Sequence, residues 1–315
     1  MADTPHPADS PSGAFAPSAP FDDLTADTVL RSCDGCHFRV HRLVLSRASP
    51  FFDTMFSLPQ PAGENDVPII EVAEPGRLLD CFLRVWYPGA DMAAIDGLDE
   101  LDKIMELALA KYDMRFLARI LQKHVETYTE TSCVAVFALA CRYGWRDVAK
   151  AAARQSLKLD FRKLYSDTSL TPHLKHISAD HLQALLRYHN ACSLAASSVG
   201  PDLPWLSSES CWIKCSEGCD IHPTRQIHFQ NNRLCRIILR TWIFHYIDAA
   251  AAILKDRPAA NVQDPSVLVT ALSNTAACNG ICRTNGPRDL AVFITKEFIP
   301  AVNSAIEAVP LEISF

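Results

Sequence analysis

Two clusters of cysteines in the last third of the chain are the residues of this sequence best suited to metal chemistry. Five of the twelve cysteines lie in them: Cys211, Cys215, Cys219, Cys278 and Cys282. Residues four apart share one face of a helix, where two thiolates can reach a common ion. A tetrahedral zinc ion needs four ligands. The candidate ligands are Cys215, Cys219, Cys278 and Cys282, with Cys211 and His222 as substitutes.

Two other interpretations of these cysteines stay open. They can be buried thiols that pack one helix end against another, or they can form a disulfide. Both the zinc and the buried-thiol interpretations predict that the two clusters meet, with sulfur atoms of the two about 4 Å apart.

A separate pair, Cys33 and Cys36, has the C-x-x-C spacing of metal half-sites and redox motifs. Between them lies Asp34-Gly35, a dipeptide typical of the type I′ turn, in which both central residues need positive φ. We therefore expect a hairpin in which the cysteines flank a two-residue turn and face each other across the ladder. The hairpin explains the spacing, and thioredoxin-like context is missing. Asp34 and Gly35 are thus expected to be structural residues.

The usual enzymatic motifs are missing from the sequence. No two glycines are two residues apart, which excludes G-x-G-x-x-G, and no Walker A, G-x-S-x-G or H-E-x-x-H motif is present. We expect no catalytic residues, no enzymatic activity and no cofactor, with zinc at the cysteine clusters as the alternative. A Cys/His pair from distant parts of the chain is the remaining enzymatic alternative, because such residues need not be adjacent in sequence.

Charge and composition argue against several classes of partner and location. The net charge of -6 offers no basic field for phosphates, so nucleic acid is not an expected partner. Charged residues interrupt the most apolar segment, Leu234 to Leu254, so we expect no membrane span. Residues 1–21 are proline-rich without an apolar core, which indicates a disordered tail rather than a signal peptide. Twelve cysteines without such a signal indicate a reducing compartment, the cytoplasm or the nucleus.

The elements that position these residues begin with the hairpin and two short helices. Phe38 and Val40 alternate on one face of the second strand. Ser49 is a good N-cap for the second helix, and Pro50 is a good residue for its first turn. The run PIIEV predicts a strand that pairs back onto the hairpin, and an amphipathic helix follows from Pro75. Three strands with several helices predict a compact α+β unit.

From Leu98 onward the sequence shows only helical periodicity, so the rest of the chain is expected to be all-α. Five helical segments, with Gly144 as a predicted C-cap, lead to a break rich in Ser, Pro and Gly near residue 197. Three more helices are predicted at Asn232 to Leu254, at Pro265 to Cys278 with Asp264 as its cap, and at Pro287 to Val309.

The first third of the chain resembles the BTB (POZ) domain. The similarity is carried, in order, by DTVLRSCDGCHFRVHRLVLSRASPFFDTMF, IIEV and LLDCFLRVWYP, and covers about residues 24–120. The segments ELALAKYDM and ALACRYGWRDVAKAAARQSLK look similar to the helical continuation of fungal BTB proteins, in the style of a BACK region. The expected division is a tail (1–21), a BTB domain (22–125), a BACK-like region (126–197) and a helical, cysteine-containing region (198–315).

The resemblance implies roles for particular residues. In this fold the position of His41 is a structural histidine at a strand-to-helix junction, where an imidazole can hydrogen-bond backbone groups left open by the turn. Asp27 and Arg42 match charged positions near the dimer groove of some BTB domains, which implies an ion pair or a pocket. A solvated surface pair is the alternative. Fungal proteins of this type often look similar around the cysteines, with pairs before and after a Trp-containing helix, here the one with Trp242.

The resemblance also implies the kind of function. We expect a protein–protein interaction module, a scaffold or self-associating protein whose partners are other proteins and itself. The alternative is a substrate adaptor that docks on the cullin of a ubiquitin ligase. Such adaptors tend to carry an apolar-x-Glu element, but no large apolar residue lies two before Glu64, and no kelch or ankyrin period follows. Strand-exchanged dimerisation is disfavoured, because the proline-rich residues 5–23 cannot form the preceding helix.

Overall fold

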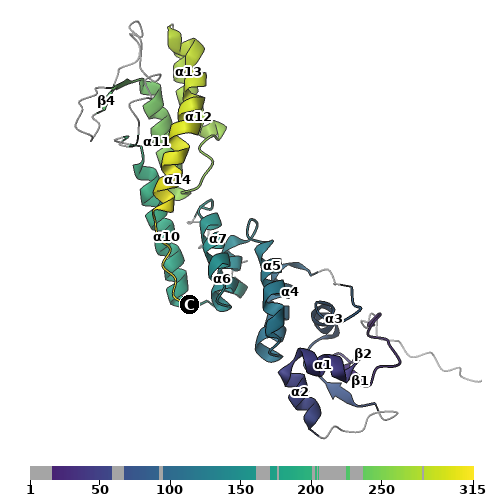
Figure 1. Cartoon of the computed structure of the whole chain (residues 1–315). Coiled ribbons are helices and arrows are strands. Elements are labelled where there is room, and N and C mark those ends of the chain that lie inside the picture. Colours follow the sequence, from purple (N-terminus) through teal and green to yellow (C-terminus); the bar gives the residue numbers. More distant parts are fainter. Residues whose placement is uncertain are drawn as a thin grey trace, which may run out of the picture. The chain divides into compact units, whose positions relative to one another are not determined.

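The structure is a computed structural model that describes residues 16–58, 67–91, 95–160, 171–175, 177–200, 203, 205, 225–227, 237–278 and 280–315. The chain forms two compact units, Met1–Tyr128 and Thr129–Phe315, which run from purple to teal and from teal to yellow in Figure 1. Over the described residues, no helix has both the length and the apolar character needed to cross a membrane.

The first unit is built on a three-stranded sheet, as the sequence predicts. Its strands are β1 (Thr28–Arg31), β2 (His37–Val40) and β3 (Ile69–Glu71), in the order β2-β1-β3. The hairpin partners β1 and β2 are antiparallel, and Leu30 lies opposite Phe38 in the core. Strand β3 pairs back onto β1 in parallel, which confirms the pairing expected for the PIIEV run.

The predicted hairpin is confirmed, but the predicted two-residue type I′ turn is wrong. The last ladder pair is Arg31 with His37, and the loop closes through hydrogen bonds from Ser32 N–H to the Cys36 carbonyl and from Gly35 N–H to the Ser32 carbonyl. Of the turn residues only Gly35 has positive φ, at 84°. The cysteines therefore do not face each other across the ladder. Cys33 is exposed and Cys36 is buried.

Two helices follow the hairpin and pack on each other (Figure 1): α1 (Arg42–Ala48) and α2 (Pro50–Ser57). Ser49 caps α2 as predicted, since its Oγ accepts a hydrogen bond of 3.3 Å from Phe52 N–H. The same hydroxyl donates to the Tyr112 carbonyl, 2.6 Å away, and so ties the start of α2 to a segment 63 residues later.

The rest of the first unit is helical and supplies the aromatic core. Its elements are α3 (Gly76–Arg84), α4 (Gly97–Met105), the π-helical turn η2 (Glu106–Lys111), the 3₁₀ turn η3 (Arg115–Leu117) and α5 (Ala118–Glu126). The Tyr112 ring, which follows η2, stacks on Phe52 and Phe82 at centroid distances of 4.8 and 5.3 Å. This stack joins α2 and α3 to the end of η2.

The second unit is mainly helical, in agreement with the predicted fold class. Its helices are α6 (Cys133–Arg142), α7 (Arg146–Ser156), α9 (Thr171–Leu174), α10 (Ala179–Ser198), α11 (Thr241–Asp256), α12 (Pro265–Ala277), α13 (Ile281–Phe293), the π-helical η6 (Ile294–Phe298) and α14 (Ile299–Glu307). Gly144, with φ of 72°, follows α6, and Asp264 caps α12 by accepting from Ser266 N–H at 2.9 Å. The predicted Asp264 cap is confirmed, whereas the C-cap residue of α6 is Tyr143, one residue before the predicted Gly144.

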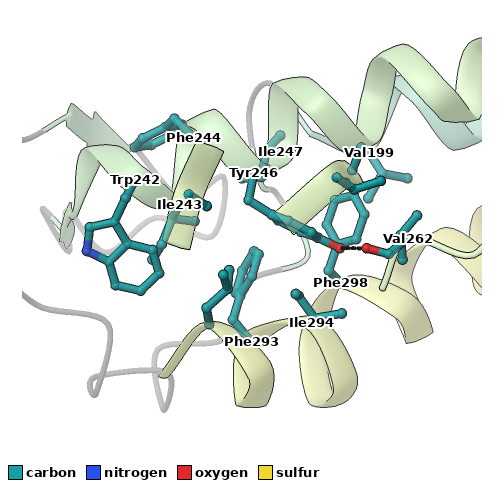
Figure 2. Close-up of a cluster of buried hydrophobic side chains, with 14 of the residues drawn as sticks. Val199, Trp242, Ile243, Phe244, Tyr246, Ile247, Val262, Phe293, Ile294 and Phe298 are labelled. Atoms are coloured by element: carbon teal, nitrogen blue, oxygen red, sulfur yellow. Dashed lines mark hydrogen bonds between the residues drawn. The ribbon is translucent and has the colours of Figure 1, made fainter. Parts of the chain in front are cut away.

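An aromatic cluster forms the core between α11 and the last helices (Figure 2). Tyr246 meets Phe298 edge-on at 5.4 Å and donates a hydrogen bond of 3.4 Å to the Val262 carbonyl. Phe293 lies 6.1 Å from the Phe298 ring and 6.2 Å from the Tyr246 ring. Burial raises the pKa of Tyr246, so this hydroxyl stays protonated.

Three local predictions in the second unit are wrong. Strand β5 (Ile237–Leu239), which pairs antiparallel with β4 (Arg225–Ile227), occupies part of the predicted helix, so α11 begins at Thr241 rather than Asn232. Successive β-branched residues at 237 and 238 favour the strand. Helix α13 begins before Pro287, which it contains, and the last helix ends at Glu307, followed by extended chain.

Candidate functional site

Asp27 and Arg42 lie together, Asp27 directly before β1 and Arg42 at the start of α1. Asp27 Oδ1 accepts a hydrogen bond of 2.7 Å from the backbone N–H of Arg42, the first residue of α1. The N-cap residue of α1, His41, makes no side-chain cap, so Asp27 satisfies this helix terminus from a distance of 15 residues. The contact joins Asp27 to the Arg42 backbone rather than to its guanidinium.

The Arg42 side chain points toward α2 instead. Its guanidinium donates to the Phe56 carbonyl, and its Cζ lies 4.9 Å from the centroid of the Phe56 ring. The group therefore stabilises the last turn of α2, where carbonyls lack helical partners and a cation is favourable. The sequence pointed to the pair, but not to this division of roles.

A surface hollow of about 780 Å³ lies between β1, α1 and α2. Its lining is charge-balanced and partly apolar: Asp27, Arg42, Leu43, Ser46, Arg47, Asp53, Phe56 and Ser57. Leu43 is 68% exposed at this face. We call this surface the α1–α2 face. Its combination of an exposed leucine with both signs of charge suits a protein partner.

His41 sits at the strand-to-helix junction as expected, but its partner is a side chain. Its Nδ1 lies 3.0 Å from the Tyr87 hydroxyl, which also accepts the His41 backbone N–H at 2.8 Å. The Tyr87 ring is buried against Phe21. Burial raises the pKa of Tyr87, and the hydrogen bond from the His41 N–H lowers it by a smaller amount. Tyr87 lies in the segment LLDCFLRVWYP that carries the resemblance to the BTB domain, but nothing in the sequence indicated that it would be the partner of His41.

Asp34 connects the hairpin to α3. Its carboxylate oxygens accept the Gly76 N–H at 2.9 and 3.1 Å, and Oδ1 also accepts from Ser32 Oγ. The Ser32 hydrogen bond lowers the pKa of Asp34, because it favours the ionised form. Gly76 is the first residue of α3, so this carboxylate serves as the helix cap that Pro75 cannot supply.

Gly76 is required by this close approach. A Cβ added there would lie 2.6 Å from Cys36 Sγ and 3.0 Å from Cys36 Cβ. We expect Gly76→Ala to lower the free energy of unfolding of the first unit by about 1–3 kcal/mol, as overpacking typically does. Chemical denaturation measures the loss. In the Cys36→Ala background the same substitution should cost less, and equal costs in both backgrounds would contradict the steric account.

A buried acidic residue that sequence reasoning missed holds η2 in place. Glu74, between β3 and α3, accepts hydrogen bonds from Lys111 Nζ and from the Tyr112 hydroxyl, the latter at 3.1 Å. The Glu74 side chain is buried, whereas that of Lys111 is partly exposed. Burial, reinforced by the Glu74 charge, raises the pKa of Tyr112, so the phenol remains a donor. Nothing in the local sequence distinguishes Glu74 from a surface glutamate.

The predicted zinc ligands fall into two groups. Cys215 and Cys219, with their substitutes Cys211 and His222, lie outside the described residues. Cys278 and Cys282 are buried in the core of the second unit. They do not share one helix face, because α12 ends before Cys278 and α13 begins at Ile281.

Over the part of the chain that the structure describes, no three His, Cys, Asp or Glu side chains gather as metal ligands. Whether the two cysteine clusters meet stays a prediction.

The described thiols differ sharply in environment, which predicts their reactivity. Cys33 is exposed, whereas Cys36, Cys81 and Cys141 are buried. Burial raises the pKa of all three buried thiols, to about 11 for Cys81 and about 12 for Cys141. A raised pKa lowers the thiolate fraction at pH 8, and only the thiolate is alkylated. We expect iodoacetamide to label Cys33 at least tenfold faster than these three, measured by peptide mass mapping. Equal labelling of Cys36 would show an open loop.

The comparison with protein-family models agrees with this geometry. The family model of the BTB/POZ domain matches residues 21–129. Residues 21–129 thus form a BTB/POZ domain, a protein–protein interaction module, and a helical region follows it. A search of curated proteins returned no match.

Proposed function

We propose that this protein is a self-associating scaffold, and that the α1–α2 face of its BTB domain binds the same face of a second copy. A two-fold dimer joins one surface patch to itself, so the patch must be self-complementary. The α1–α2 face meets that requirement because Arg47 and Asp53 are both exposed on its rim around the apolar Leu43. The main support for the proposal is that this face combines balanced charges with an exposed leucine.

Multi-angle light scattering of the full chain tests the dimer. Arg47→Asp should weaken self-association at least tenfold, because it places like charges opposite Asp53 of the second copy. The double variant Arg47→Asp with Asp53→Arg should restore it, since both charges are exchanged at once. Leu194→Asp, at an exposed leucine of the second unit, is the matched control and should have no effect. Unchanged association in the single variant would refute this interface.

The cullin-adaptor alternative predicts a different partner for the same domain. The loop in which its apolar-x-Glu element would lie, 59–66, falls outside the described residues. A pull-down of the tagged full chain, scored both for a cullin and for a second tagged copy, separates the two functions. Recovery of a cullin without self-association would favour the adaptor.

Several finer assignments complete the proposal. Residues 126–197 serve as a BACK-like extension of a fungal-type BTB protein, supported by the packed pair α6 and α7. The cytoplasm or the nucleus is the proposed compartment, on the ground of twelve cysteines. No nucleic acid is involved, because the chain carries a net charge of -6.

A further inference from the structure

An extended segment follows α14 in the second unit. We call Val309–Phe315, with the sequence VPLEISF, the strap. From Val309 to Ser314 its residues alternate: Val309, Leu311 and Ile313 are half-buried, while the intervening Pro310, Glu312 and Ser314 are exposed. Period-two alternation in an extended chain places all the apolar side chains on one face. The strap therefore lies on the protein as an extended peptide lies on a binding surface.

The strap runs back along α10 toward the start of that helix (Figure 1). Near its end, the Ser314 carbonyl lies 2.7 Å from His181 Nε2, in the first turn of α10. The Phe315 ring lies 5.9 Å from the His181 ring, and the Arg146 guanidinium of α7 lies 5.3 Å from its centroid. Two helices thus form a polar and cationic seat for one aromatic residue.

The strap does not fill the surface beneath it. A cavity of about 370 Å³ lies between it and α10, lined by Gln183, Arg187, Tyr188, Val309 and Glu312 among others. A second cavity of about 180 Å³ shares Tyr188 and Val309. Tyr188 is buried, and burial raises its pKa to about 12.

The strap is also weakly bonded. Within the described residues, no backbone–backbone hydrogen bond involves residues 310–315. Phe315 remains 44% exposed. Few buried contacts and an unfilled cavity are typical of a segment that opens at low free-energy cost.

We propose that the surface of α7 and α10 under the strap is a groove for an extended peptide of a partner protein, and that the strap occupies it in cis. The fitting peptide has apolar side chains at alternate positions, followed by an aromatic residue that enters the seat of Arg146 and His181. The strap supports this choice of partner, because it has the same pattern of alternate apolar side chains and an aromatic residue, and it lies on this surface. The groove is distinct from the α1–α2 face and does not depend on self-association.

Competition with the strap makes the proposal measurable. A tethered segment competes at a high effective concentration, so an added peptide binds the intact chain weakly. We expect a fluorescent VPLEISF peptide to bind the full-length Ile313→Ser, Phe315→Ala variant at least tenfold more tightly than the wild-type chain, by fluorescence anisotropy. A peptide carrying the same two substitutions should not bind. Adding Arg146→Ala to the variant should weaken binding of the unsubstituted peptide.

A second arm avoids any dependence on the folding of the variant. A protease site inserted after Glu307 is cut in the folded chain, which is otherwise wild-type, so that the strap is held by its contacts alone and no longer by its tether. The cleaved protein should bind the labelled peptide at least tenfold more tightly than the uncut protein. Equal affinity before and after cleavage would overturn the proposal, as would equal affinity of the wild type and a folded strap variant.

Discussion

Replacing Tyr112 with alanine is expected to lower the free energy of unfolding of the BTB unit by about 3–5 kcal/mol, the usual cost of deleting a large buried aromatic side chain. The ring lies between Phe52 of α2 and Phe82 of α3, and it also meets Phe51 edge-on at 5.3 Å. Its removal leaves a cavity where α2, α3 and the end of η2 meet. Hydrogen exchange with peptide resolution measures the loss in residues 21–129 separately from the second unit.

Tyr112→Phe is the matched control, because it retains the ring and removes only the hydroxyl bonded to Glu74. We expect the free energy of unfolding to fall by about 1–3 kcal/mol, the usual range for a buried acceptor that loses one donor. The lower end of this range is expected, because Lys111 still donates to Glu74. If the two variants lost equal stability, the hydroxyl rather than the stacked ring would hold this core together. Self-association should weaken with Tyr112→Ala, since α2 forms part of the α1–α2 face.

Phe293→Ala is expected to have a comparable effect in the second unit, about 3–5 kcal/mol. Its fully buried ring contacts Tyr246 and Phe298, and Trp205 lies 6.1 Å away, so one substitution removes contacts among α11, α13 and η6 (Figure 2). Urea denaturation followed by tryptophan fluorescence reports the change, because Trp242 and Trp205 lie in or against this cluster.

Val269→Ala is the control for this unit, because Val269 is an exposed residue of α12. We expect it to change stability by less than about 0.5 kcal/mol, as surface substitutions usually do. A loss from Phe293→Ala no larger than that of the control would contradict the aromatic core.

The sequence by itself determined those features whose physical cause lies within a few residues. Ser49 and Pro50 begin α2, Asp264 caps α12, and the Asp34-Gly35 dipeptide marks a reversal between two alternating runs. Each depends on a local hydrogen bond or a local φ preference, so residue type and spacing are enough to predict it. The order of these signals across the first third also carried the resemblance to the BTB domain, which the family comparison matches at residues 21–129.

Only the tertiary structure decided which residues, far apart in the sequence, form hydrogen bonds with one another. Asp34 turns toward Gly76 and leaves a single positive-φ residue in the loop, Asp27 caps a helix 15 residues away, and His41 meets Tyr87. The local sequence is compatible with several partners for such groups. The packing of β1, α1 and α3 selects one of them, because it places these side chains next to backbone N–H groups at the starts of α1 and α3 that have no acceptor within their own helices.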